Sequence, residues 1–154
     1  MSTVDHYLNH ILTTAADEAR TDGTTTIEAH HLLLAIARDG SPALTAAGLD
    51  HTTIRTALDH EFTTSLAAAG VHLAGALPLP TTPPTGSPQL GTTARTALER
   101  GLATARRKRD CTPAHLLLGI LLTPVGTVPR ALDLAGIDRT ALTDAVRRET
   151  TDDH

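Results

Sequence analysis

A short apolar run occurs twice in this sequence and divides it into two similar halves. The first copy covers residues 29–36 and the second covers residues 113–120, so the copies start 113 − 29 = 84 positions apart. Such a run does not by itself distinguish a strand from a buried helix. The flanks favour helices, because Thr112 supplies a capping hydroxyl before Pro113, and Thr26 precedes the first copy in a similar way. We therefore predict two short central helices that other helices cover.

Apolar periodicity predicts four helices in the first half of the chain. They cover about residues 4–22, 26–39, 42–47 and 51–66. The last of these begins after Asp50, a residue suited to capping. Its apolar positions follow the helical period and are expected to face the core: Ile54, Ala57, Leu58, Phe62 and Leu66.

The second half repeats this order of helices. It predicts helices at about residues 92–108, 113–122, 128–135 and 139–150. The turn at residues 47–50 matches the turn at residues 135–138, but here the offset between the two glycines is 136 − 48 = 88. The connection before the third helix is therefore four residues longer in the second copy. Two copies with matching helices and turns indicate an internal duplication.

A proline-rich segment separates the two copies. It contains five prolines, which preclude a continuous helix there: Pro78, Pro80, Pro83, Pro84 and Pro88. We assign residues 1–69 to the first repeat, 70–89 to the connector and 90–154 to the second repeat. Each repeat is near the size at which one core becomes marginal. We therefore expect an all-α fold of eight helices, in which the repeats pack together around a pseudo-twofold axis. Six side chains of the central helices should be buried: Leu32, Leu33, Ile36, Leu116, Leu117 and Ile120.

Composition narrows the classes of function. The net charge of −4 gives no general attraction to nucleic acid or to anionic membranes. Cys111 is the single cysteine, so an internal disulfide is impossible and a reducing compartment is indicated. The sequence has neither a targeting segment nor an apolar run of membrane-spanning length. We expect a soluble cytoplasmic protein.

No catalytic or metal-binding constellation emerges from the sequence. His31 and His115 stand at the starts of apolar helices, where a structural histidine bonded to backbone is the favoured interpretation. His6 and His10 are four residues apart, but a structural zinc site needs four ligands, so we predict no metal and no cofactor. No serine lies in a Gly-x-Ser-x-Gly context and no phosphate-binding loop is present. Cys111 is interpreted as a small packing residue. We therefore expect no enzymatic activity.

A basic run at residues 106–109 leaves two interpretations open. Cations at the end of a helix are favoured by its dipole, so a solvated helix end explains the run. The alternative is a contact for an acidic partner or for nucleic acid.

The pattern as a whole resembles the Clp N-terminal domain, the double Clp repeat that precedes the ATPase rings of ClpA-, ClpB- and ClpC-type unfoldases. Residues 15–20 (Ala-Ala-Asp-Glu-Ala-Arg) resemble the first-helix motif of the ClpC branch, and residues 115–120 (His-Leu-Leu-Leu-Gly-Ile) resemble the central motif. The distance from that motif to Gly136 also fits the family. The resemblance covers nearly the whole chain apart from the connector, and it implies an all-α, non-catalytic recognition module.

This resemblance implies a protein or peptide partner. The expected role is that of adaptor, decoy or regulator of a Clp protease system, with a Clp-type ATPase, its adaptors or its substrates as partners. The alternative is a sequestering protein that holds cyclic peptides or other small molecules in the groove of the fold and so protects the cell's own unfoldase. A regulator that contacts nucleic acid through residues 106–109 is the least favoured interpretation.

The resemblance also suggests where a partner would bind. The groove of the family lies near the starts of the first helices of the two repeats, which we expect to lie together. In this chain the corresponding residues are Met1, Val4 and His6 on one side, and Leu90, Thr92 and Arg95 on the other. His30 and Ala114 occupy the positions at which phosphoarginine-binding relatives carry glutamate. Because neither side chain offers a carboxylate to a guanidinium group, we expect no phosphoarginine binding.

Overall fold

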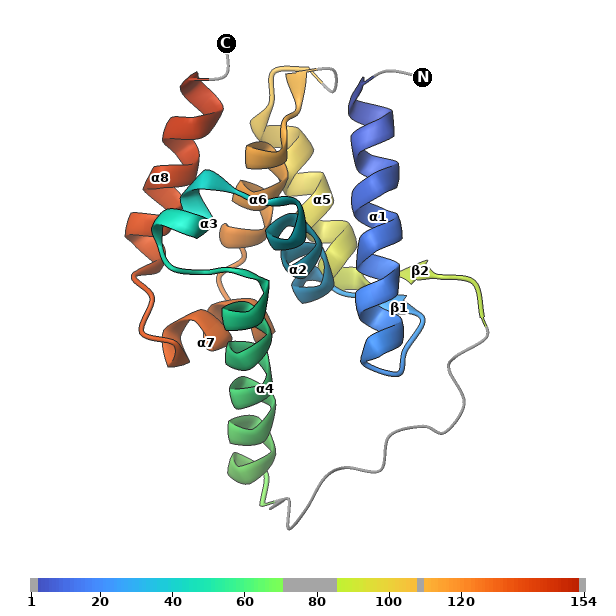
Figure 1. Cartoon of the computed structure of the whole chain (residues 1–154), viewed down its shortest axis with the longest axis vertical. Helices are drawn as coiled ribbons and strands as arrows, with labels where there is room; N and C mark the ends of the chain where they lie inside the picture. Colours follow the sequence, from blue (N-terminus) through green and yellow to red (C-terminus); the bar gives the residue numbers. More distant parts are fainter. Residues whose placement is uncertain (1–2, 71–85, 108–109, 153–154) are drawn as a thin grey trace.

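A computed structural model describes residues 3–70, 86–107 and 110–152 of the chain. These residues form eight helices and one pair of two-residue strands (Figure 1). The elements are α1 (Thr3–Thr21), β1 (Thr26–Ile27), α2 (Ala29–Asp39), α3 (Pro42–Ala46), α4 (His51–Ala68), β2 (Gln89–Leu90), α5 (Thr92–Thr104), α6 (Pro113–Leu121), α7 (Thr127–Leu134) and α8 (Arg139–Asp152). The all-α fold of two four-helix repeats is confirmed. Most of the proline-rich connector lies outside the described residues.

Short polar side chains begin several of the predicted helices. The Asp50 carboxylate accepts the backbone N–H of Thr53 at 2.7 Å at the start of α4, and Ser41 caps α3 in the same manner. At the start of α6 the Thr112 side chain accepts the backbone N–H of His115, while the Thr112 N–H donates to His115 Nδ1 at 3.0 Å. This reciprocal capping box explains why a histidine stands at the third position of the motif.

The start of the first central helix differs from the prediction. Thr26 does not open α2, because Thr26 and Ile27 form a parallel strand pair with Gln89 and Leu90. Glu28 is the N-cap instead, and it makes the same capping box with His31 that Thr112 makes with His115. The strand pair was not predicted, because its partner lies more than sixty positions away and neither strand shows a periodic pattern. It joins the beginning of the second repeat to the first.

The core is built from both repeats around the two central helices. All six predicted core side chains of α2 and α6 are buried, and one continuous apolar cluster includes residues from both halves of the chain. His31 and His115 are buried with them as structural histidines. Small side chains fill the seam between each first helix and its central helix, including Ala15 and Ala19 in α1 and Ala94 and Ala97 in α5.

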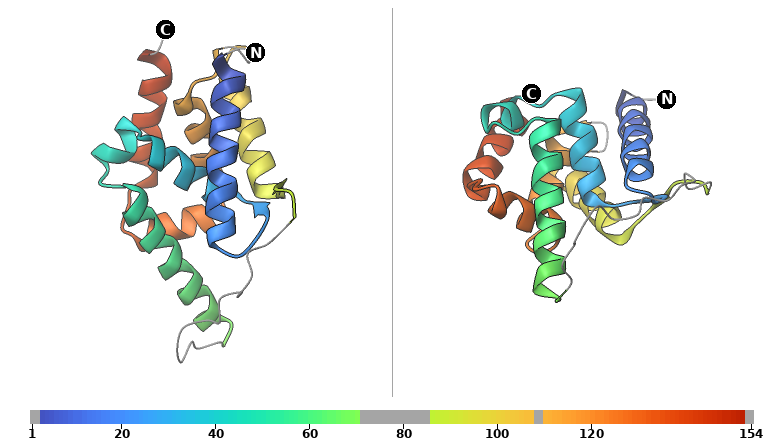
Figure 2. Two further views of the ribbon diagram at one scale, coloured as in Figure 1. Left: turned by 45° about the vertical axis from the view of Figure 1, so that its right-hand side comes forward. Right: turned by 60° about the horizontal axis from the view of Figure 1, so that its bottom comes forward.

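The two repeats pack against each other around a pseudo-twofold axis, with helices of one repeat contacting helices of the other. Helices α2 and α6 contact one another at the centre, with α1 against α2 and α5 against α6. The third helix of each repeat packs on the fourth helix of the other, so that α7 contacts α4 and α3 contacts α8 (Figures 1 and 2). The connection between the central and third helices is longer in the second repeat, as predicted: residues 122–126 against residues 40–41.

Two predicted features of individual helices are wrong. Phe62 is 48% exposed rather than in the core, because α4 extends past the body of the molecule (Figure 2) and its last turns have little to pack against. Helix α5 ends at Thr104 rather than near residue 108, and residues 108–109 lie outside the described part of the chain. Of the helices in the described residues, none combines the length and apolar character needed to cross a membrane.

Candidate functional site

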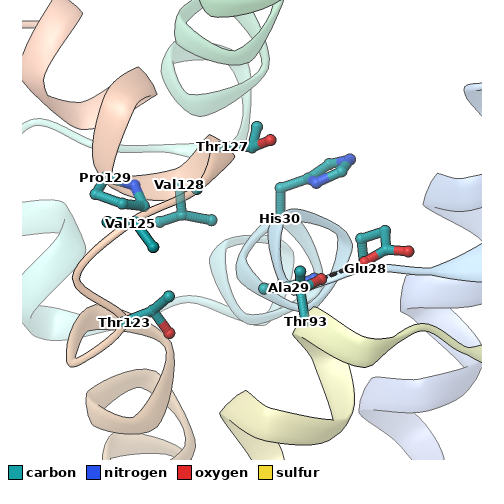
Figure 3. A pocket seen from close by; sticks show the side chains of 10 residues that line it. Glu28, Ala29, His30, Thr93, Thr123, Val125, Thr127, Val128 and Pro129 are labelled. Atoms are coloured by element: carbon teal, nitrogen blue, oxygen red, sulfur yellow. Dashed lines mark hydrogen bonds between the residues drawn. The ribbon is translucent and has the colours of Figure 1, made fainter.

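A pocket of about 160 Å³ lies where the first turn of α2 meets the second repeat (Figure 3). We call it the His30 pocket. It is lined by Glu28, Ala29 and His30 from the start of α2, Thr93 from α5, and residues 123 and 125–129 from the α6–α7 connection and the start of α7. Val125, Val128 and Pro129 form its apolar side, and Val125 is 76% exposed. The pocket therefore combines apolar walls with a carboxylate and an imidazole.

A hydroxyl of the second repeat fixes the polar side of this pocket. The Thr93 hydroxyl donates to the Glu28 carboxylate, and the same oxygen accepts the backbone N–H of Ala29 at 2.9 Å. Glu28 is held from its own helix as well, because its carboxylate accepts the backbone N–H of His31 in the capping box. The carboxylate consequently has a defined orientation, with acceptor capacity that these two donors do not exhaust.

His30 is an uncharged imidazole at neutral pH. Its ring is half-buried and lies beside the ring of His31, with 4.1 Å between the centroids. Burial, followed by the neighbouring His31, lowers the pKa of His30 to about 4. The pocket thus offers a neutral group that can donate or accept a hydrogen bond, and the only full charge on its lining side chains is that of Glu28.

A second pocket, of about 280 Å³, is the counterpart of the first at the start of α6. We call it the Glu149 pocket. Pro113 and Ala114 stand where Ala29 and His30 stand in the first pocket. The α2–α3 connection takes the place of the α6–α7 connection, and Glu149 of α8 completes the lining. Both predicted family positions, His30 and Ala114, thus line pockets, although neither supplies a carboxylate.

A buried ionic network lies behind the His30 pocket and holds three helices of the first repeat together. Glu18 of α1 is 4% exposed and binds His51 at 2.6 Å and Arg55 at 2.5 Å, both from α4. Burial alone would raise the pKa of Glu18, but these hydrogen bonds and charges outweigh it and hold the pKa below its ordinary value. The same balance, with His31 and Arg55 as partners, lowers the pKa of Asp22.

Asp22, His30 and His31 form the one cluster in the described residues with the spacing of a metal site. Each places one ligand atom within 4.8 Å of the others. However, His31 Nδ1 accepts the Glu28 N–H, so its Nε2 carries the proton and donates to Asp22 at 2.9 Å. Arg55 also donates to Asp22, at 2.6 Å. The guanidinium already supplies the positive charge that a metal would bring, and the cluster is assigned to the ionic network.

The structure separates the residues predicted for the partner groove. Helices α1 and α5 run in opposite directions, so their starts lie at opposite ends of the molecule (Figure 1). The exposed His6 lies one turn before His10, which pairs with Asp39 at the end of α2 at 2.7 Å, whereas the start of α5 contacts the start of α2 through Thr93. The expectation that the two starts lie together is therefore wrong. Met1 and the side chain of Val4 lie outside the described residues.

The second half of the predicted groove borders a separate hollow. Leu90 lines a groove of about 380 Å³ between α1 and β2, which we call the α1 groove; Leu12, Ile27 and Arg20 also line it. Thr92 and Arg95 are exposed on the first turn of α5. Of the predicted residues, Leu90 borders this groove, whereas no pattern in the sequence indicated Leu12 or Arg20 as part of a site.

The remaining sequence candidates have structural roles or stay untested. Cys111 is buried, and burial raises the pKa of its thiol, which is the opposite of what a nucleophile needs. Arg106 and Arg107 are exposed after the end of α5, and the rest of the basic run lies outside the described residues.

Comparison with known proteins identifies the fold. No family model matches the sequence, and no curated protein matches it. Among solved structures, the chain is similar to the N-terminal domain of the caseinolytic protease associated chaperone ClpD from Arabidopsis thaliana, with a TM-score of 0.66 and 18% sequence identity. The match covers 92% of this chain and 90% of that chain. The chain therefore has the fold of a Clp N-terminal domain, as its sequence predicts.

Proposed function

We propose that this chain, which has the fold of a Clp N-terminal domain, is a non-catalytic module that binds polypeptide segments. Its role is that of adaptor, decoy or regulator of a Clp protease system, and its partners are a Clp-type ATPase, its adaptors or its substrates. The observation that carries the proposal is the His30 pocket, which opens at the junction of the two repeats. The structural similarity to the N-terminal domain of a caseinolytic protease associated chaperone supports the choice of system.

The lining of the His30 pocket suits an apolar side chain of an extended peptide. Val125, Val128 and Pro129 offer apolar contact, and the volume of about 160 Å³ accommodates one side chain rather than a folded element. The Glu28 carboxylate can accept a backbone N–H of the same peptide. Because His30 is uncharged at neutral pH, the pocket gains no affinity for anionic groups from it.

A purified Clp-type ATPase from the same cell, titrated against the labelled chain, tests the proposal directly. Val125→Asp places a charge on the exposed apolar rim of the pocket without touching the core, and it should weaken binding at least about tenfold, equivalent to 1.4 kcal/mol. Phe62→Asp is the matched control, since Phe62 is also an exposed apolar residue but lies on α4. Equal binding by all three proteins, or none by the unmodified chain, would contradict the proposal.

A second candidate function is favoured by the α1 groove. Its volume of about 380 Å³ and its lining by Leu12, Ile27 and Leu90 fall within the range of small-molecule sites. A cyclic peptide or another peptide-like molecule held there would make the chain a sequestering protein. Native mass spectrometry of the chain isolated from its own cells should then show a bound mass that Leu90→Gln removes. A chain that carries no added mass would exclude this alternative.

A further inference from the structure

A carboxylate at the end of α2 lies beside a pair of histidines on α1. His10 Nε2 is 2.7 Å from Oδ1 of Asp39, the last residue of α2. His6 precedes His10 by four residues in the same helix. The sequence offers the two histidines as metal ligands, and the fold adds an oxygen ligand from a second helix.

The spacing of the two histidines allows both to bind one transition-metal ion. Residues four apart lie on the same face of an α-helix, and His-Glu-x-x-His helices bind zinc with two histidines at this spacing. His6 stands outside ligand distance of His10 and Asp39 in the structure, but its side chain is exposed and can rotate towards them. Bonds of about 2.0 Å to a tetrahedral Zn²⁺ would separate His10 Nε2 and Asp39 Oδ1 by roughly 3.3 Å. Side-chain rotations therefore suffice to open the present contact for the ion.

Two imidazoles and one carboxylate define the class of metal. Two histidines and a glutamate hold the ion in one class of zinc site, with the fourth position open to water. Aspartate supplies the same kind of oxygen ligand. Imidazole nitrogen suits Zn²⁺, whereas Mg²⁺ and Ca²⁺ prefer oxygen ligands. The set therefore selects zinc over Mg²⁺ and Ca²⁺.

The charged side chains near these ligands leave the carboxylate available. Among the ion pairs of the described residues, Asp39 pairs with His10 and with no arginine. Arg38, its neighbour in the chain, pairs with Glu18 instead, at 3.5 Å. Asp5 is the one charged residue other than histidine among residues 3–16, and it adds negative charge beside the first histidine of the pair. Within the described part of the chain, no internal cation therefore takes the place of a metal at Asp39.

Two features act against a cation here, and both are weaker than a bond to a ligand. The starts of α1 and α3 carry partial positive charge, which the partial negative charge at the end of α2 offsets only in part. Arg106 and Arg107 are exposed after α5, at the end of the molecule where α1 begins (Figure 1). Exposed charges are screened over about 8 Å at physiological salt, whereas zinc ligands bind at about 2 Å. The three ligands therefore decide whether an ion is held.

From this arrangement we infer that His6, His10 and Asp39 bind one Zn²⁺ ion, with water at the fourth position. The ion joins α1 to the end of α2 and so stabilises the folded first repeat. The Asp22 cluster differs in this respect, because Arg55 already donates to its carboxylate at 2.6 Å. The inference goes beyond the proposed function, because the lining of the His30 pocket includes none of these three ligands.

Calorimetric titration of the tag-free, metal-free chain with Zn²⁺ measures the site directly. One Zn²⁺ should bind per chain, and Mg²⁺ at the same concentration should give no binding heat. His6→Ala, His10→Ala and Asp39→Asn should each weaken Zn²⁺ binding at least about tenfold. His60→Ala is the matched control, because His60 is an exposed histidine of α4, and it should leave the affinity unchanged.

The melting temperature provides a second measurement. Zn²⁺ should raise it in the unmodified chain and in His60→Ala, but not in His10→Ala. Circular dichroism of the metal-free variants would show that they fold. Three results would each overturn the inference: no binding at about 1 mM Zn²⁺, binding that His6→Ala leaves unchanged, or binding that His30→Ala abolishes, which would assign the ion to the Asp22 cluster.

Discussion

The two repeats have the same order of helices but secure the first helix to the rest of the repeat by different chemistry. In the first repeat, a buried carboxylate on α1 binds two basic side chains of α4. In the second repeat, α5 approaches α6 so closely that the contact requires glycine on both helices. The first helix is thus held in place by polar partners in the first repeat, and by close backbone contact at two glycines in the second repeat.

The glycine contact tolerates no added volume. A Cβ atom on Gly119 of α6 would lie 2.3 Å from the carbonyl oxygen of Ala97 and 2.4 Å from the backbone nitrogen of Gly101. Its counterpart in the first repeat is Ala35, since 119 − 84 = 35, so the crossing of α1 and α2 accommodates the Cβ that the second repeat excludes. The first repeat therefore accommodates a methyl group at this crossing and adds a polar link from α1 to α4, whereas the second relies on direct backbone contact.

The largest expected effect on stability concerns the apolar core that the two repeats share. Leu33→Ala in α2 and its counterpart Leu117→Ala in α6 each remove a fully buried side chain, and each should lower the free energy of unfolding by about 2–5 kcal/mol. Because one apolar cluster spans both repeats, each variant should still unfold in a single transition. Calorimetry would detect two separate transitions if the repeats were independent, and that result would contradict the shared core.

The second prediction concerns the glycine contact, which only the second repeat has. Gly119→Ala forces α5 and α6 apart and should destabilise the protein by about 3 kcal/mol, the upper end of the range for overpacking, because the nearest atoms belong to the backbone. Gly86→Ala is the control, since its Cβ would meet only ordinary contacts at 3.7 Å and beyond. Urea unfolding measures both, and a Gly119→Ala protein as stable as the control would mean that the two helices lie farther apart.

A pH dependence should belong to the first repeat alone, because His30 corresponds to Ala114. The folded pKa of His30, about 4, is lower than its unfolded value near 6.5, so the unfolded chain binds the proton more tightly. The stabilisation is complete above pH 6.5 and is lost as the pH falls towards 4, by up to roughly 3 kcal/mol. His30→Ala should flatten urea midpoints over this interval, whereas His60→Ala, at an exposed position of α4, should not. A slope that both variants retain would assign the effect to other groups.

The smallest effect tests the ionic network. Glu18→Gln keeps the shape of the side chain but removes its charge, and it should cost about 1–3 kcal/mol at neutral pH. Since the folded pKa of Glu18 is lowered, its contribution is present above the ordinary carboxyl pKa and is lost as the pH falls through the folded value. The difference between variant and parent should therefore shrink in acid. A difference that is constant down to pH 2 would point to packing rather than charge.

Local signals in the sequence were sufficient for most of the fold. The caps at Ser41, Asp50 and Thr112 satisfy helix ends with neighbours only a few residues away, so helix starts could be read from short segments. The prediction that Thr26 opens the first central helix was wrong, because the role of Thr26 depends on its strand pairing with Gln89. The prediction that Phe62 is buried was also wrong, because the helical periodicity continues past the point where α4 has a neighbour to pack against.

The candidate sites depended on relations that no local pattern contains. His30 and Ala114 were singled out through the family motif, but their pockets exist only because each central helix faces a connection of the other repeat. The expectation that the starts of α1 and α5 lie together was wrong for the same reason, because the opposite directions of these helices are a property of the packed structure. Glu149 lines the second pocket from α8, and no motif in the sequence distinguished it.

The crosswise packing of third and fourth helices also bears on how such a chain can arise. A single four-helix unit that exposed the same surfaces would pair with a second copy of itself, giving a twofold-symmetric homodimer whose two binding sites are identical by necessity. Once two units are joined in one polypeptide, each position exists twice in the gene and can mutate independently. Arg130 and Pro42 occupy corresponding positions, since 130 − 42 = 88. A homodimer would carry the same residue at both positions. In this chain one repeat has an arginine there and the other a proline, so the two halves differ in charge.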